Sequence, residues 1–384
     1  MDKALFSQVF ILKRKNKIMR HLLFFFLSIF VLSCNQNSKN TINQTTKSGS
    51  IRYSNYFSFQ RNGDEINLTV FSKDKKNKTV YRLNKNKTSE NSINIPLKKV
   101  ICMSSTHAIF INSLGKSESI KAISGVKYVN NDTLKSKISA NKIIEVGYES
   151  SLNYEQIIKI NPDAIFVYDI GSGTSNAINK LKELGFQIIF VNEFLENTPL
   201  AKAEWIKFFS FFFDSEILAD SIFNTTEKEY IKLSETVKNI NYRPSVLASI
   251  PMKNVWYIPG TNSYFYKLIS DAGANFIIDS NEETGSVAMN IENVFAQSVD
   301  VDFWLNLEMV KSRNEIVLID ERLSAIKAFR TNNVYNNDLK SNKFGGNSYW
   351  EEGTIYPHLI LRDLINILHP EILNDSLIYY RKME

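Results

Sequence analysis

The histidines and carboxylates of this 384-residue chain do not fall into a pattern that catalysis or metal binding requires. Beyond residue 33 the histidines are His107, His358 and His369, and none is paired at the spacing of a zinc site, which usually takes three or four protein ligands. The chain also lacks a glycine-rich dinucleotide fingerprint, a phosphate-binding loop and a nucleophile elbow. These residues favour binding over catalysis, and they predict neither a metal site nor a cofactor.

Polar and aromatic side chains follow the predicted strands, which is where open α/β sheets bind their ligands. In the second half of the chain these strand ends lie at 256–264, 285–288 and 306. Aromatic rings offer large flat contact areas and favour a ring-containing ligand, although any single aromatic residue has a place in the core as its alternative. The candidate ligand-binding residues are Ser104, Ser105, Thr106, His107, Tyr148, Glu149, Tyr168, Gly171, Trp256, Tyr264, Arg322 and Trp350.

One pattern occurs twice, at 146–167 and at 285–305. Each copy reads as a loop, a short helix with an asparagine and then a glutamate at its start, and an apolar strand. The spacing from Glu155 to Asp163 equals that from Glu292 to Asp300. The simplest reading is that each glutamate stabilises its helix N-terminus by about 0.3–1 kcal/mol. Building the same unit twice also predicts two matching lobes with a ligand between them.

The elements that must position these residues change in style near residue 98. Alternating residues and the turn signal Asn62-Gly63 predict a small antiparallel β element at 51–97. Strands then alternate with helices, which predicts two parallel-sheet α/β lobes, at 98–197 and 242–384. Between them, Thr198-Pro199 begins a helical region, 198–241, that includes one long rigid helix bridging the lobes. We expect helices at 200–213, 216–240 and 359–368, and a strand at 316–319.

The N-terminus carries most of the formal charge. Residues 1–33 hold six basic residues and one acidic residue, so the net charge of +6 falls to about +1 for the rest, which gives no footprint for nucleic acid. A basic stretch and the apolar run 22–32 predict a signal peptide at 1–33, with translation starting at Met1 or Met19. Leu32-Ser33-Cys34 resembles a bacterial lipobox, which implies acylation of Cys34; the alternative is an ordinary cysteine in a cleaved peptide. Residues 34–50 read as a disordered tether.

Several segments together resemble a known family. They are 99–115, 146–169, 180–191, the long connecting helix and the terminal Tyr356-Pro357-His358 region with His369-Pro370-Glu371. In these segments the chain resembles a substrate-binding lipoprotein of an ABC importer, of the class that takes up iron–siderophore, haem or cobalamin. The resemblance covers roughly 98–375 and is most specific from Asn153 to Asp163. The loop at 104–107 and the added β element depart from the family plan.

The resemblance implies a function as well as a fold. It implies a periplasm-facing membrane lipoprotein, held to the membrane by its lipid anchor only, that binds a metal chelate as a monomer. It further implies that Glu155 and Glu292 dock onto arginines of an ABC permease, which works with its ATPase. A haem would use His107, Tyr148 or Tyr264 as axial ligand, a siderophore would use Arg322, and cobalamin would use aromatic residues. The alternatives are a two-lobed α/β enzyme, such as a glycosyl transferase, and an adhesion or scaffold lipoprotein.

Overall fold

The computed structural model describes residues 50–86, 92–148, 151–168, 172–278 and 284–384, all of which belong to one compact unit. The first of them build a four-stranded sheet in which β1 (Phe57–Asn62), β2 (Glu65–Phe71) and β3 (Lys78–Asn84) are antiparallel and β4 (Ile93–Asn94) runs parallel to β3. Asn62 pairs with Glu65 across the turn, and Gly63 supplies the positive φ that this turn needs. The predicted hairpin is present.

The sheet of the first lobe is wholly parallel, with strands in the order β7-β6-β5-β8-β9. Its central strands β5 and β8 are buried along their whole length, as expected for a parallel sheet that is covered on both faces. The strands are β5 (Val100–Cys102), β6 (Ile120–Ile123), β7 (Ile144–Glu145), β8 (Ala164–Val167) and β9 (Ile188–Phe190), and the helices are α2 (Ser105–Ser113), α3 (Asp132–Ser139), α4 (Tyr154–Ile160) and α5 (Ser172–Glu183).

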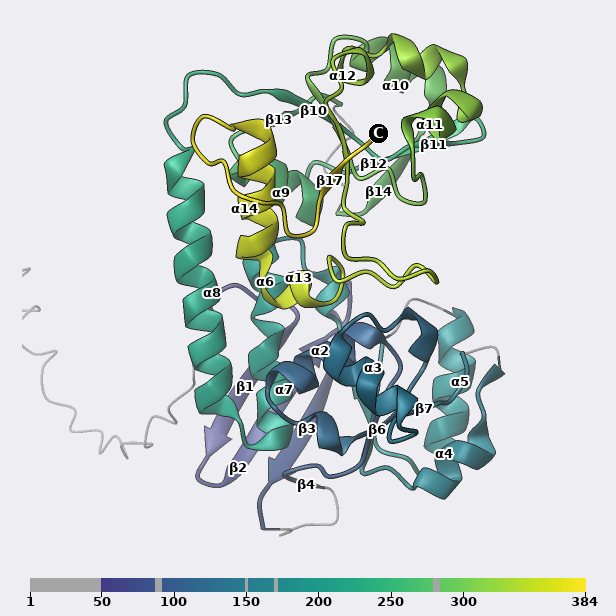
Figure 1. Cartoon of the computed structure of the whole chain (residues 1–384). Coiled ribbons are helices and arrows are strands. Elements are labelled where there is room, and N and C mark those ends of the chain that lie inside the picture. The colour runs from purple at the N-terminus through teal and green to yellow at the C-terminus, as the bar shows by residue number, and fades with distance from the viewer. Residues whose placement is uncertain (1–49, 87–91, 149–150, 169–171, 279–283) are drawn as a thin grey trace, which may run out of the picture. The chain divides into compact units, whose positions relative to one another are not determined.

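Three helices follow this lobe. α6 (Pro199–Ala203) begins with Thr198 as N-cap, whose side chain accepts a hydrogen bond from the backbone N–H of Ala201. Every residue of α7 (Trp205–Phe213) is buried, because β1 packs on one side of this helix and α2 and β8 on the other. α8 (Glu216–Thr236), 21 residues and therefore about 31 Å long, runs beside α7 and α14 (Pro357–Leu368) (Figure 1).

The second lobe holds a sheet in the order β13-β10-β15-β16-β17, parallel except at β17, and a separate antiparallel sheet β11-β12-β14. The strands are β10 (Ser245–Ala248), β11 (Pro251–Met252), β12 (Val255–Pro259), β13 (Asn275–Phe276), β14 (Ser286–Asn290), β15 (Phe303–Leu305), β16 (Val334–Asn336) and β17 (Arg381–Lys382). The helices are α9 (Tyr264–Asp271), α10 (Ile291–Ser298), α11 (Arg313–Ile319), α12 (Lys327–Arg330), α13 (Glu352–Ile355) and α14.

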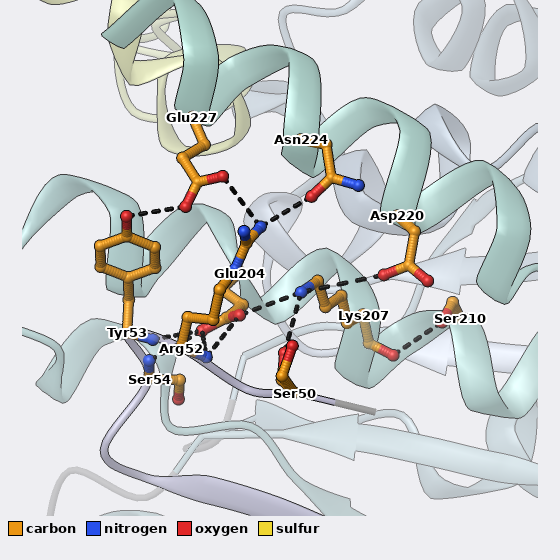
Figure 2. Close-up of polar contacts among 10 residues, drawn as sticks. All are labelled: Ser50, Arg52, Tyr53, Ser54, Glu204, Lys207, Ser210, Asp220, Asn224 and Glu227. Carbon is orange, nitrogen blue, oxygen red and sulfur yellow. Dashed lines mark hydrogen bonds and ion pairs between the residues drawn. The ribbon is translucent and has the colours of Figure 1, made fainter. Parts of the chain in front are cut away.

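Two buried carboxylates hold the chain that leads into β1. Glu204, between α6 and α7, accepts hydrogen bonds from the backbone N–H groups of Arg52, Tyr53 and Ser54 at 2.8–3.1 Å and from the ammonium of Lys207 at 3.1 Å (Figure 2). Glu196 accepts from the next two backbone N–H groups, those of residues 55 and 56, and from the indole of Trp205. Five consecutive backbone amides are thus tied to two carboxylates; we call residues 52–56 the strap.

The predicted fold class is confirmed: two α/β lobes with parallel sheets, one long helix and a small β element in front of them. Three local expectations were wrong. Residues 316–319 lie in α11, whose N-cap Ser312 accepts a hydrogen bond from the backbone N–H of Glu315. The helix at 200–213 is interrupted at Glu204, and the long helix ends at Thr236. Among the described residues, no helix is long and apolar enough to cross a membrane.

The two copies of the repeat differ in detail. The second copy opens with the strand β14 instead of a loop. Asp163 directly precedes β8 and accepts the backbone N–H groups of Lys98 and Lys99, whereas the residue that directly precedes β15 and accepts the N–H of Ser245 is Asp302. The structural counterpart of Asp163 is therefore Asp302. The equal sequence spacing from Glu155 to Asp163 and from Glu292 to Asp300 does not relate structurally equivalent aspartates.

Candidate ligand-binding site

A cavity of about 540 Å³ opens at the carboxyl ends of β10, β15 and β16 in the second lobe. In chain order the strands of this sheet run 2-1-3-4-5, so the chain switches direction between β10 and β15, and such a switch point is where open α/β sheets bind ligands. The lining residues are Phe194, Glu196, Lys202, Ala248, Ser249, Tyr257, Pro259, Ser263, Tyr264, Phe265, Thr284, Gly285, Ser286, Asn306, Glu308, Met309, Lys311, Asn337, Asp338, Ser341, Gly345, Asn347 and Trp350.

The strand ends around this cavity are strained. Ser249, Asn306 and Glu308 have φ values of 59°, 56° and 56°, which lie in the left-handed region that non-glycine residues seldom adopt. Such conformations cost about 1–3 kcal/mol each and gather at functional sites. All three residues line one cavity, which makes it the candidate ligand-binding site of the lobe.

Buried side chains hydrogen-bond the backbone at or next to two of these residues, Ser249 and Glu308. The indole N–H of Trp256 donates to the carbonyl of Ala248 and the hydroxyl of Ser249, and the indole N–H of Trp304 donates to the carbonyl of Ser249 at 2.7 Å. Asn336, which is fully buried, donates through Nδ2 to the carbonyl oxygens of Glu308 and Val310 at 3.1 and 3.0 Å. The two tryptophans and Asn336 therefore shape the cavity from behind without lining it.

The cavity wall combines aromatic rings with a few charges. Trp350 and Tyr257 are about half exposed, and the ammonium of Lys202 lies 4.8 Å from the ring centroid of Tyr264. Burial lowers the pKa of Lys202, and the carboxylates of Glu193 and Glu196 oppose that shift. The cavity can therefore offer flat apolar contacts together with one half-buried cation.

A loop of the second lobe, residues 337–352, reaches the first lobe; we call it the bridging loop. Asn342 donates through Nδ2 to the carbonyls of Lys127 and Val129 at 3.1 and 3.2 Å. The backbone N–H of Asn130 donates to the carboxylate of Glu351 at 3.1 Å. Gly346 lies so close to the backbone carbonyl of Tyr128 that an added Cβ would clash with it. The bridging loop thus joins the cavity wall to the first lobe.

Replacing Glu351 with glutamine is expected to remove a pH-dependent part of the stability. Burial raises the pKa of Glu351 to about 7, so this carboxyl keeps its proton in the folded chain after it has ionised in the unfolded chain. Its contribution to stability is therefore full below the unfolded pKa near 4.5 and is lost as the pH rises toward 7. In the wild type, this carboxyl should lower the free energy of unfolding by on the order of 3 kcal/mol as the pH rises from 4.5 to 7.5. We expect Glu351→Gln to remove that decrease.

Denaturation at a series of pH values checks this expectation. Glu352→Gln is the matched control, because Glu352 is the next residue and accepts one side-chain hydrogen bond from Asn131 at 2.8 Å. Glu193, whose pKa burial also raises to about 7, is present in all three proteins, so the comparison isolates Glu351. Parallel pH profiles for the wild type and Glu351→Gln would contradict the assignment.

Two of the predicted ligand-binding residues, Tyr264 and Trp350, line the cavity. Trp256 lies in the core behind Ser249. His107 is fully buried between the rings of Tyr168 and Phe209, and burial lowers its pKa to about 3, so it is a neutral core residue. These two corrections have one cause, since apolar surroundings beside a strand end draw large rings inward.

The other first-lobe candidates that the structure describes, Ser104, Ser105, Thr106, Tyr148 and Tyr168, lie at the carboxyl ends of β5, β7 and β8, outside the cavity lining. Ser104 is the N-cap of α2 and accepts a hydrogen bond from the backbone N–H of Thr106, while the hydroxyl of Ser105 hydrogen-bonds Glu351 of the bridging loop. Tyr148 is exposed next to Tyr128. Glu149, Gly171 and Cys34 lie outside the described residues.

Arg322 also lies outside the cavity, on the surface of the second lobe. Its guanidinium donates to both carboxylate oxygens of Glu292 at 2.9 and 3.0 Å and to Asp320 at 2.7–3.1 Å. It also covers the ring of Phe295, at 5.9 Å from the centroid. We expected Arg322 at the end of a strand and therefore near the ligand. The segment before it is the helix α11 instead, so Arg322 is not at a strand end.

The cavity also contains residues that the sequence did not single out. They are Phe194, Lys202, Glu308, Lys311 and Asp338. Lys202 and Lys207 are the two lysines of the mostly apolar segment 199–213, and a lysine in such a segment was an available signal. Asp338 follows Val334–Asn336, a strand too short to show a period in the sequence.

Comparisons with known proteins agree on one family. A family model described as periplasmic binding protein matches residues 100–339, more than half of the chain. An uncharacterised lipoprotein of Methanocaldococcus jannaschii is 31% identical over 294 residues, which are 73% of this chain and 67% of that protein.

Two solved structures share the fold at low sequence identity. A periplasmic heme binding protein from Pseudomonas aeruginosa has a TM-score of 0.60 and 13% identity, and the match covers 75% of this chain and 98% of that one. A periplasmic vitamin B12 binding protein from Vibrio cholerae has a TM-score of 0.52 and 14% identity, with 71% and 97% covered. The family and these neighbours are binding proteins and not enzymes. The chain belongs to the periplasmic binding protein family.

Proposed function

We propose that this chain is a lipid-anchored receptor of the cell envelope that binds a metal chelate and delivers it to an ABC permease. The observation that carries the proposal is the cavity of about 540 Å³ at the switch point of the second lobe, framed by strained strand ends and aromatic rings. Small-molecule sites usually have volumes of about 300–1,000 Å³. The ligand class of the proposal is an iron–siderophore complex, haem or cobalamin, and the receptor acts as a monomer anchored through Cys34.

The printed names of the relatives support this class and this location. The two solved neighbours bind heme and vitamin B12, in each of which a metal is held in a flat macrocycle that suits an aromatic wall. The archaeal relative is named a lipoprotein, which supports an anchor on the cell envelope.

Delivery to the permease is proposed to use the glutamates of the two repeated helices. Glu155 lies in the first turn of α4 and Glu292 in the first turn of α10, and each helix is capped by the asparagine that the repeat predicted. Glu155 is exposed and forms no hydrogen bond or ion pair with any residue that the structure describes. Glu292 is bound by Arg322, so a permease arginine has to replace Arg322 there.

The purified chain should show saturable quenching of its tryptophan fluorescence by one member of a chelate panel. Three of the four tryptophans, at 205, 256 and 304, are fully buried, whereas Trp350 is 53% exposed on the cavity wall. Trp350 is therefore the tryptophan that a bound chelate contacts directly, while Trp256 and Trp304 lie behind the cavity wall. The panel holds ferric siderophores, haemin and cobalamin, titrated into the full-length lipoprotein in detergent.

Trp350→Phe is the control variant, because it keeps an aromatic ring in the wall and removes the reporter. We expect it to lose the part of the quenching that Trp350 reports while it still binds the chelate by equilibrium dialysis. An absence of binding to every chelate would contradict the receptor function and favour the scaffold alternative.

A further inference from the structure

Among the described residues that line the cavity, Lys202 is the cation that forms no ion pair with a described carboxylate. The other cation, Lys311, donates to Asp338 at 2.6 Å, and Asp338 also binds Arg381 at 2.7 Å. The ammonium of Lys202 contacts the ring of Tyr264, but no acceptor among the described residues lies within hydrogen-bonding or ion-pair distance of it. An ammonium has three N–H donors, and a half-buried charge without acceptors is costly.

The neighbouring carboxylates oppose the lowering of the Lys202 pKa by burial, and they do so without using its donors. Glu193 and Glu196 both act on the ammonium through space. The oxygens of Glu196 are engaged by Trp205 and by the strap. Glu193 is buried, and its own pKa is raised to about 7, so it carries only part of a charge at neutral pH. The donors of Lys202 thus remain available on the cavity side.

We propose that Lys202 binds an ionised oxygen of the ligand, either a carboxylate or a catecholate, beside a ring that lies against the aromatic wall. This inference rests on the proposed function and narrows it, because a chelate without an accessible anionic oxygen gains nothing from Lys202. A charge-assisted hydrogen bond to a half-buried ammonium has the strength to select between chelates. Such ionised oxygens are present on haem, in its propionate groups, and on catecholate or carboxylate siderophores.

The test compares four proteins against two kinds of probe. The proteins are the full-length wild type, Lys202→Met, Lys202→Arg and the control Lys340→Met, which removes an exposed lysine of the bridging loop that does not line the cavity. The anionic probes are haemin, ferric citrate and a ferric tris-catechol chelate; the probes without an accessible carboxylate or catecholate are ferrioxamine B and cyanocobalamin. Affinity is read from Trp350 quenching and from dialysis.

We expect an anionic probe to bind best and Lys202→Met to weaken that probe by about tenfold to a hundredfold. Lys202→Arg should restore most of the affinity, Lys340→Met should match the wild type, and ferrioxamine B and cyanocobalamin should bind Lys202→Met and the wild type alike. The anionic probe that binds also identifies the source of the oxygen.

Two results would overturn the assignment and leave the receptor function standing: equal affinity of Lys202→Met and the wild type for the anionic probe, or wild-type binding of ferrioxamine B or cyanocobalamin alone. A wild type that binds none of the five probes would overturn the receptor function as proposed, and the Lys202 assignment with it.

Discussion

Glu204→Gln is expected to lower the free energy of unfolding by about 3–5 kcal/mol, the range for breaking a buried charged network on one side. Glu204 is fully buried, and its two oxygens accept from three backbone N–H groups and from Lys207. Glutamine offers only one oxygen, and its NH₂ group would face backbone donors. The ammonium of Lys207 would also lose its buried counter-charge. Urea denaturation followed by circular dichroism measures the change.

Glu216→Gln is the matched control. Glu216 also bonds a cation at short distance, the guanidinium of Arg61 at 2.6 Å, but both side chains are partly exposed, and such pairs contribute about 0–1 kcal/mol. Lys207→Met should lower the free energy of unfolding less than Glu204→Gln does, because the three backbone N–H donors of the strap still hydrogen-bond the carboxylate of Glu204. If Glu204→Gln were as stable as the control, the strap would not be held by this residue.

Replacing both Glu155 and Glu292 with alanine is expected to abolish chelate uptake and to leave chelate affinity unchanged. Each desolvated charge pair at a protein interface is worth about 2 kcal/mol or more, so loss of both weakens docking by roughly a thousandfold. Neither residue lines the cavity, so binding in the purified protein should not change. Uptake of the labelled chelate in cells and dialysis of the purified variant give the two readouts.

The single variants should differ, because only one of the two glutamates is already paired. Glu155→Ala removes a carboxylate that has no partner among the described residues, whereas Glu292→Ala removes one that Arg322 partly neutralises, so the first should reduce uptake more. Arg322→Gln, which frees Glu292, should not reduce uptake. The control is the double variant of Glu183 and Glu321, exposed acidic residues on the same lobes. Normal uptake in the Glu155/Glu292 variant would rule out this docking mode.

The sequence predicted the sheets and helices well where the pattern was local. The β1–β2 hairpin, the capped start of α6 and the two capped repeat helices follow from a turn residue or a capping residue next to an apolar run. It failed at α11, where four apolar residues fit a buried strand and a helix equally well. The contact of Glu204 with the strap was also out of reach, because the strap lies about 150 residues earlier in the chain.

The candidate site was predicted only in outline. The strand-end rule led to Tyr264 and Trp350, which line the cavity; their role in ligand binding stays a prediction. Which of the neighbouring rings faces inward depends on packing across elements, so Trp256 and His107 could not be separated from Tyr264 by sequence. The pairing of Arg322 with Glu292, 30 residues apart, depends on how η5 (Glu321–Ala325) folds against α10, which no local pattern records.

The strap also determines how the folded body bears mechanical load. A pull on the chain at residue 50 reaches the amides of residues 52–56 before it reaches β1, and these amides are fastened to Glu204 and Glu196. The guanidinium of Arg52 and the hydroxyl of Tyr53 are bound in addition by Glu227 of α8, at 2.9 and 2.7 Å. Tension is therefore transmitted to the helices that carry Glu204 and Glu227, and little of it reaches β1, the edge strand of the small sheet.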